Sequence, residues 1–176
     1  PPPISKQEAN QVVFNDRIKK FFSETSYNKT NFTGEVTDWI TLQRNAKPGG
    51  ECQYPQAEEV YPLIKDKFNL GNYDRLILLA NISTTLCDRG YGTLGKSSHN
   101  LGGTNYSFSV ASMPVDSNWL SEESSPIPSW RWLDSVISHE LGHNLGVVHA
   151  NSLECQGSKI LGTGCHHREY GNRFDV

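Results

Sequence analysis

HELGHNLGVVH, at residues 139–149, is the stretch from which this 176-residue chain can be interpreted. On a helix, His139 and His143 lie about one turn apart, so both imidazoles point to the same side. His149 would face away from them if the helix continued. Gly146 is the residue type that commonly ends a helix in the left-handed conformation, and the chain can turn back there. The three histidines therefore predict the ligands of one zinc ion.

Three imidazoles leave one tetrahedral position open, where the pKa of a water would fall toward ~7. Glu140 lies about 100° round the helix from His139, so it is placed to accept a proton instead of binding metal. The alternatives are ordinary histidines and a closed structural zinc site. A closed site more often uses cysteine, and no cysteine lies within the motif. The pattern favours hydrolytic chemistry.

The length and the charge of the chain limit the remaining possibilities. The 176 residues suit a single domain, residues 1–176, that can bury a core. The net charge is −3, and no basic run is present, so we expect no nucleic-acid partner. No apolar stretch approaches the ~20 residues of a membrane span. We expect a monomer.

Four cysteines and four N-glycosylation sequons favour secretion, the sequons only weakly. The cysteines form no CxxC pair, which argues against a zinc ribbon. We favour Cys155–Cys165, which closes a short loop, with Cys52–Cys87 as the second bridge. Three pairings are open to four cysteines, and four free buried thiols are the alternative. The sequons begin at Asn28, Asn31, Asn81 and Asn105.

Hydrophobic periodicity predicts three helices. The first covers residues 5–25, with Ser5 as its N-cap and Glu8 three residues later. The second covers residues 56–68, where Pro62 would kink or break it. The third carries the zinc motif and faces the core with Leu133, Val136, Ile137 and Leu141.

Three strands are predicted, at residues 32–42, 75–82 and 105–112. The run at 75–82 is continuously apolar and is the best candidate for a central strand covered on both faces. Residues 90–103 are rich in Gly, Ser and Asn, which predicts mostly loop or a short irregular strand. The organisation is therefore α/β.

Two other patterns suggest weaker alternatives. Residues 90–95 read GYGTLG and match the dinucleotide pattern GxGxxG, with Asp116 about 20 residues on. That site needs a helix directly after the loop, and the residues that follow do not suggest one. The glycines are better explained by a strand bulge or by close approach of a ligand backbone. His166 and His167 suggest a second metal site, but a solvent-exposed pair is favoured.

The zinc motif resembles that of the metzincin clan of zinc peptidases. The flanking FSETSY at 22–27, GEVTDW at 34–39 and EYGNRFDV at 169–176 are similar to the gametolysin family. The resemblance implies His139, His143 and His149 as zinc ligands and Glu140 as general base. It also implies an α+β, zincin-like fold, in which a twisted mixed sheet has a long backing helix and an active-site helix. It also implies an edge strand, within residues 91–96, that would hold an extended substrate antiparallel along the cleft.

Two features depart from the resemblance. Metzincins place a methionine in a tight turn beneath the zinc, after the third histidine, whereas the only methionine here, Met113, precedes the motif. The first core strand expected before the first helix is also missing. The expectation is a fragment truncated at both ends, covering the upper subdomain and lacking the first strand and the Met-turn.

The sequence thus predicts a secreted zinc metalloendopeptidase that acts on protein or peptide substrates, with cell-wall or extracellular glycoproteins implied by the resemblance. The alternative is a non-catalytic zinc-containing module that binds peptides or glycoproteins. A nucleotide-dependent enzyme that uses Gly90 and its neighbours is a third hypothesis.

Overall fold

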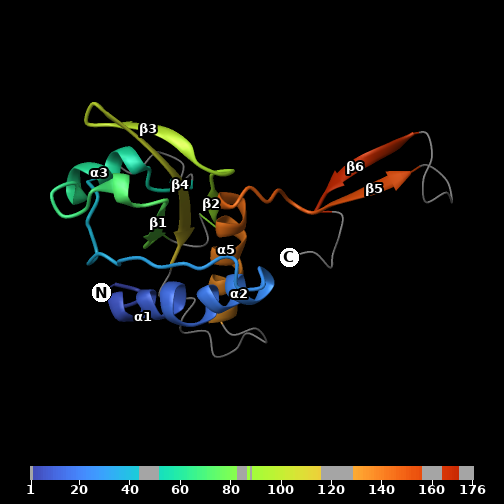
Figure 1. Cartoon of the computed structure of the whole chain (residues 1–176), viewed down its shortest axis with the longest axis horizontal. Coiled ribbons are helices and arrows are strands. Elements are labelled where there is room, and N and C mark those ends of the chain that lie inside the picture. The colour runs from blue at the N-terminus through green and yellow to red at the C-terminus, as the bar shows by residue number, and fades with distance from the viewer. Residues whose placement is uncertain are drawn as a thin grey trace.

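The computed structural model describes residues 2–43, 52–82, 87, 89–115, 129–155 and 164–170. In it, helices lie against a small twisted mixed sheet, and a separate two-stranded hairpin projects from this body (Figure 1). The helical elements are α1 (Lys6–Asn10), the π-helical turn η1 (Gln11–Asn15), α2 (Arg17–Thr25), α3 (Ala57–Ile64), the 3₁₀ turn η2 (Leu70–Asn72) and α5 (Ser129–Asn144). The strands are β1 (Arg75–Ala80), β2 (Tyr91–Gly92), β3 (Ser97–Leu101), β4 (Thr104–Pro114), β5 (Asn151–Cys155) and β6 (Cys165–Glu169).

Strand β4 is the centre of the main sheet. It pairs parallel with β1 on one side and antiparallel with β2 and β3, in the order β1-β4-β2. The expectation that residues 75–82 form the central strand was therefore wrong within the described residues, because β1 pairs with β4 alone there. Its apolar run is explained by packing on both faces: Leu76 and Leu78 contact one core cluster, and Ile77 and Leu79 the other.

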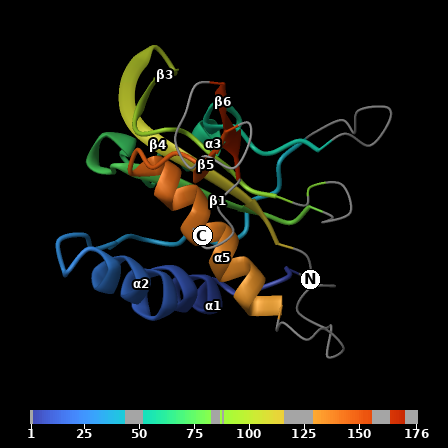
Figure 2. The same ribbon diagram turned by 90° about the vertical axis from the view of Figure 1, so that its right-hand side faces the viewer.

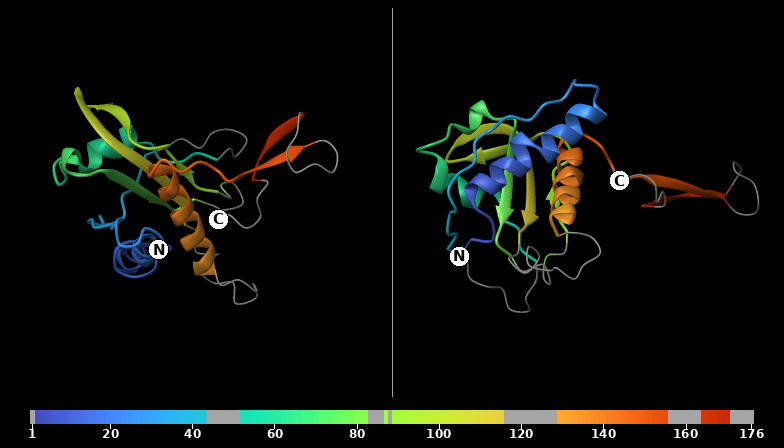
Figure 3. Two further views of the ribbon diagram at one scale, coloured as in Figure 1. Left: turned by 45° about the vertical axis from the view of Figure 1, so that its right-hand side comes forward. Right: turned by 90° about the horizontal axis from the view of Figure 1, so that it is seen from below.

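Alternation along β4 divides the core in two. Ala111 and Met113 face α2 and α5, in a cluster that includes Ile18 and Ile137. Phe108 and Val110 face the opposite side, where α3 packs with Val60 and Ile64. Helices thus cover both faces of the sheet, and Figures 2 and 3 show α1 and α2 on the same side as α5. The expected α/β class with a twisted mixed sheet is confirmed.

The first predicted helix begins where expected. Ser5 Oγ accepts a hydrogen bond from the Glu8 backbone N–H at 3.1 Å, and Glu8 Oε2 accepts one from the Ser5 N–H at 2.7 Å. This reciprocal pair is a capping box. The helical path is not uniform, because η1 interrupts it before α2 begins at Arg17.

The second predicted helix is shorter than expected. Helix α3 runs through Pro62 and ends at Ile64, and residues 65–67 form a turn. Val60 and Ile64 are buried on this helix, whereas Leu63 is 49% exposed.

Residues 32–42 form no strand in the structure; the segment is extended without a ladder partner among the described residues. Its apolar side chains explain the error. Phe32 is buried, and Val36 and Ile40 pack against the two core clusters, so the pattern records burial and not strand pairing. A side-chain period reports which residues face the core, but it does not report where the backbone hydrogen bonds go.

Residues 90–103 are more regular than predicted, because β2 and β3 both lie there and pair with β4. Strand β3 reaches β4 through a two-residue turn, Gly102-Gly103, with φ of 60° and 86°. Such positive angles suit glycine at both central positions of a tight hairpin turn.

Both expected disulfides are present, Cys52–Cys87 and Cys155–Cys165. The second lies at the end of the β5–β6 hairpin farther from residue 149, where Cys155 is opposite Cys165 in the ladder. Within the described residues, no helix has the length and apolar character needed to cross a membrane.

Candidate metal centre

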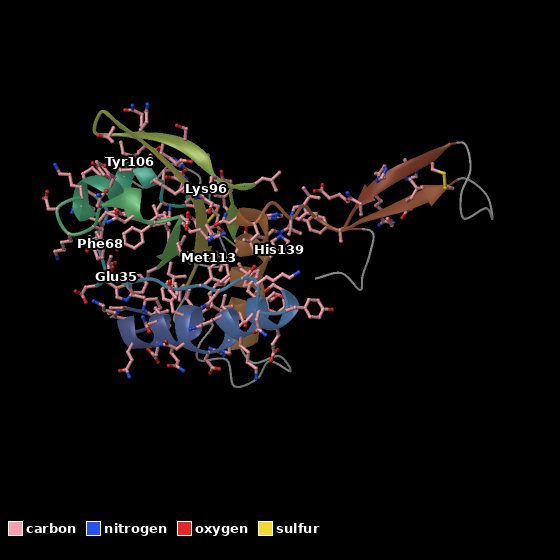
Figure 4. All side chains as sticks on the ribbon, viewed as in Figure 1. Glu35, Phe68, Lys96, Tyr106, Met113 and His139 are labelled. Atoms are coloured by element: carbon pink, nitrogen blue, oxygen red, sulfur yellow. A yellow bond between two sulfur atoms is a disulfide. The ribbon has the colours of Figure 1, made fainter. Side chains whose placement is uncertain are left out.

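Helix α5 delivers two of the three histidines. Its Leu133, Ile137 and Leu141 side chains are buried against the core, and Val136 is partly buried beside them, as predicted. His139 lies near the end of the same helix from which the chain leaves for the hairpin (Figure 4), and His143 follows one turn later, just before α5 ends at Asn144. The position of these two imidazoles is thus set by a helix that the core holds in place.

The helix ends at the predicted glycine. Gly146 has φ of 89° and donates its N–H to His143 O at 2.8 Å, while the Val147 N–H bonds Gly142 O at 3.0 Å. This pair of bonds is a Schellman motif, which reverses the chain just after α5. The reversal brings His149 back beside the other two histidines.

The three Nε2 atoms converge. His139 Nε2 and His143 Nε2 are 3.1 Å apart, and they lie 3.2 Å and 3.0 Å from His149 Nε2. Ligands of a tetrahedral zinc with Zn–N bonds of ~2.0–2.1 Å lie about 3.3 Å from one another. Among the described residues, these are the three that could jointly hold a metal ion, and their donor set fits zinc.

The outer nitrogens of two imidazoles are occupied by oxygen acceptors. His143 Nδ1 lies 2.8 Å from Val147 O, and His149 Nδ1 lies 2.6 Å from Glu169 Oε1. With the proton on Nδ1, each ring turns the lone pair of Nε2 toward the shared centre. For His139, burial and then the neighbouring imidazoles lower the pKa, which favours the neutral form that binds metal.

Glu140 is 5% exposed, and burial raises its pKa to about 7. Two glycines make room for its carboxyl group. A Cβ at Gly90 would lie 2.6 Å from Glu140 Oε1, and one at Gly92 would lie 2.9 Å from Oε2. The carboxyl group also interacts electrostatically with His149 and Tyr170.

The edge of the sheet is fastened to the end of α5. Asn144 is 4% exposed, and its Nδ2 donates to Thr93 O at 3.0 Å and to Val110 O at 2.9 Å. Gly95 adds a backbone bond to His143 O at 2.9 Å. Within the described sheet, β2 lies at the edge opposite β1, inside the range predicted for the substrate-holding strand. These hydrogen bonds therefore fix the position of the β2 edge relative to the helix that carries His139 and His143.

Several groups at the site were not predicted as site residues. Glu169 contacts His149 Nδ1, and the Tyr170 hydroxyl lies 2.6 Å from His149 Nε2. The segment that begins with Glu169 and Tyr170 is similar to the gametolysin family, but the similarity did not predict that these two residues contact His149. Asn144 and the two glycines beside Glu140 were also missed. Gly90 and Gly92 admit the Glu140 carboxyl group, a contact that the sequence did not predict.

The structure does not form the dinucleotide site or the second metal site that the sequence suggested as weaker alternatives. Residues 97–101 after the GxGxxG match are strand β3, so the loop does not open the helix that a dinucleotide site requires. Asp116, the acidic residue of that pattern, lies outside the described residues. His166 and His167 are exposed on β6, and neither belongs to a metal-binding cluster among the described residues.

A family model described as Reprolysin_5, metallo-peptidase family M12, matches residues 7–174. No curated protein and no solved structure matches the chain.

Proposed function

The chain belongs to metallopeptidase family M12, and from this premise we propose that it is a zinc-dependent endopeptidase of the metzincin type. His139, His143 and His149 would hold the metal, and Glu140 would be the general base. The observation that carries the proposal is the convergence of three Nε2 atoms at separations of 3.0–3.2 Å beside a buried carboxyl group.

When bound, zinc supplies a Lewis acid that polarises the scissile carbonyl and lowers the pKa of water. Glu140 accepts a proton from the water whose oxygen attacks the carbonyl carbon. It then gives that proton to the leaving amine as the C–N bond breaks, so that no proton is left over. Burial raises the pKa of the Glu140 carboxyl group, so its carboxylate accepts a proton more readily than an exposed glutamate would.

The β2 edge would bind the substrate. Tyr91 and Leu94 are 47% and 61% exposed beside the end of α5, and an extended peptide could add to this edge as an antiparallel strand. Asn144 and Gly95 would keep the edge at a fixed distance from the histidines. The substrate would then present its scissile bond to the metal in one register.

The finer assignments rest on the sequence. We propose a single metzincin-like catalytic domain over residues 1–176, of gametolysin-like type, acting on extracellular or cell-wall glycoproteins. Two disulfides are compatible with an oxidising, extracellular compartment. Residues 171–176 of the segment that resembles gametolysin lie outside the described part of the chain.

The test is the Glu140→Ala variant of the full chain, compared with wild type for zinc content and for hydrolysis of an unfolded protein substrate. The variant should keep one zinc per chain and lose at least ~10²-fold in kcat/KM. Glu154→Ala is the matched control, because it removes an exposed carboxylate from the hairpin. Retained hydrolysis by Glu140→Ala would reject the mechanism. Zinc and peptide binding without cleavage by wild type would favour the non-catalytic binding module.

A further inference from the structure

The third histidine lacks the support that the other two have. His139 and His143 belong to α5, whose Ile137 and Leu141 are fully buried. His149 follows a segment that carries little packing, since Val147 and Val148 are 59% and 61% exposed. A ligand on such a segment needs another element to fix the direction of its ring.

The β5–β6 hairpin provides that element. Glu169, the last residue of β6, places Oε1 2.6 Å from His149 Nδ1. It is held there by the ladder, in which it is opposite Asn151, and by the next residue, whose N–H donates to Ala150 O at 2.9 Å. The carboxylate therefore reaches the imidazole from a strand and not from a free loop.

Tyr170 also contacts His149, and its hydroxyl lies 2.6 Å from Nε2. Its φ of 58° turns the chain sharply after β6, and its ring lies 4.1 Å from the ring of His149 between centroids. The ring of His149 is thus held by a carboxylate on Nδ1 and by an aromatic face, both contributed by two consecutive residues.

We propose that Glu169 is the positioning residue for the third metal ligand and that the hairpin exists at this point of the chain to deliver it. A carboxylate on the outer nitrogen fixes the tautomer and the ring direction of a ligand histidine and makes its inner nitrogen a better donor. The outer nitrogen of His143 contacts the neutral Val147 carbonyl instead, whereas that of His149 contacts a carboxylate. The inference rests on the proposed function, because it assumes that His149 binds zinc.

The competing explanation is an exposed ion pair with no role in metal binding. The Glu169 side chain is 65% exposed, and exposed pairs contribute little to stability. The two explanations differ in what they predict. A surface pair would change neither stability nor zinc affinity when broken, whereas a positioning residue would change zinc affinity alone.

The experiment measures the zinc dissociation constant of the full chain by competition with a chromophoric chelator, for wild type, Glu169→Ala and Glu169→Gln. We expect Glu169→Ala to bind zinc 10- to 100-fold more weakly. Glu169→Gln should fall between, because an amide oxygen accepts the same hydrogen bond without the charge. Glu154→Gln, on the same hairpin and paired with Arg168 and His166, should stay within twofold of wild type.

Two further readouts separate positioning from folding. Thermal unfolding in excess chelator should be the same for Glu169→Ala and wild type, and the visible absorption of the cobalt(II)-substituted variant should differ from that of wild type. Zinc affinity of Glu169→Ala within twofold of wild type would overturn the inference and leave the proposed function standing. Failure of wild type to bind zinc would overturn both.

Discussion

Gly92 lies against Glu140 so closely that no side chain fits between them. A Cβ at Gly92 would be 2.7 Å from the carbonyl oxygen of Glu140 and 2.9 Å from Oε2. The first of these atoms is backbone of α5 and cannot move aside without moving the helix. The distance between the sheet edge and the zinc-motif helix is therefore set by the absence of a side chain.

Gly92→Ala should therefore lower the free energy of unfolding by about 1–3 kcal/mol, the usual cost of overpacking a tight contact. It should also reduce kcat/KM, since β2 and Glu140 are forced apart. Gly142→Ala is the control: it lies in the same helix, and a Cβ there meets nothing within 4 Å among the described residues. It should leave stability unchanged or raise it by about 0.5–1 kcal/mol. Urea unfolding measures both, and equal behaviour of the two variants would refute the steric account.

Asn144→Leu should cost about 1–3 kcal/mol of stability. The variant removes a buried donor that serves Thr93 O and Val110 O. Val110 O keeps its bond from the Thr93 N–H, whereas Thr93 O is left facing an apolar side chain. The exposed Asn100→Ala change, which breaks a side-chain bond to Asn105, should stay within ~0.5 kcal/mol of wild type. Urea unfolding of the two variants compares a buried amide with an exposed one. If Asn144→Leu lowered the free energy of unfolding no more than Asn100→Ala does, the Asn144 side chain would not be what holds the β2 edge to α5.

The part of the site that the sequence predicted is the part that local geometry determines. Helical spacing brings His139 and His143 to one side, and a glycine at position 146 permits the reversal that returns His149. Burial of one stripe of α5 follows from the same period. These features depend on residues within a few positions of one another, so they could be inferred without a tertiary structure.

Contacts made across the fold could not be inferred in this way. Glu169 meets His149 only because the register of β5 and β6 brings it there, and no local pattern gives that register. Gly92 and Glu140 are 48 positions apart, so no local pattern predicted that this glycine lies against the zinc-motif helix. The Gly102-Gly103 turn was a local signal, and it could have predicted the β3–β4 hairpin.

Asp134 should make stability depend on pH. Its Oδ2 lies 3.2 Å from Arg17 Nε, but its Oδ1 is buried without a hydrogen-bond donor among the described residues. Burial raises the pKa of Asp134 above its ordinary value of 3.8, against the opposing charge of Arg17. The folded state therefore holds the proton more tightly than the unfolded state. The contribution to stability is full below about 3.8 and is lost as the pH rises through the folded-state pKa.

Wild type should thus lose stability relative to Asp134→Asn as the pH rises from about 3.8, because asparagine does not titrate. Urea unfolding of both proteins at a series of pH values gives the difference in unfolding free energy. Asp38→Asn, which removes an exposed carboxylate paired with Lys6, is the control for the change in charge. A difference that grows in favour of wild type with rising pH would have the wrong sign for a buried carboxyl group.

Removal of zinc should loosen the third ligand and leave α5 intact. Ile137 and Leu141 hold α5 to the core without help from a metal, whereas residues 147–149 depend on Gly146 and on contacts to the hairpin. At zinc concentrations 100-fold above Kd, binding adds about 2.7 kcal/mol, which for a chain of this size corresponds to a rise in Tm of roughly 5–10 °C. A chelator should reverse that rise. Amide hydrogen exchange should then quicken at residues 147–150 and 165–170 and stay slow at 133–141. His143→Ala should show neither response, and loss of protection throughout α5 on chelation would mean that the metal, not the core, holds the helix.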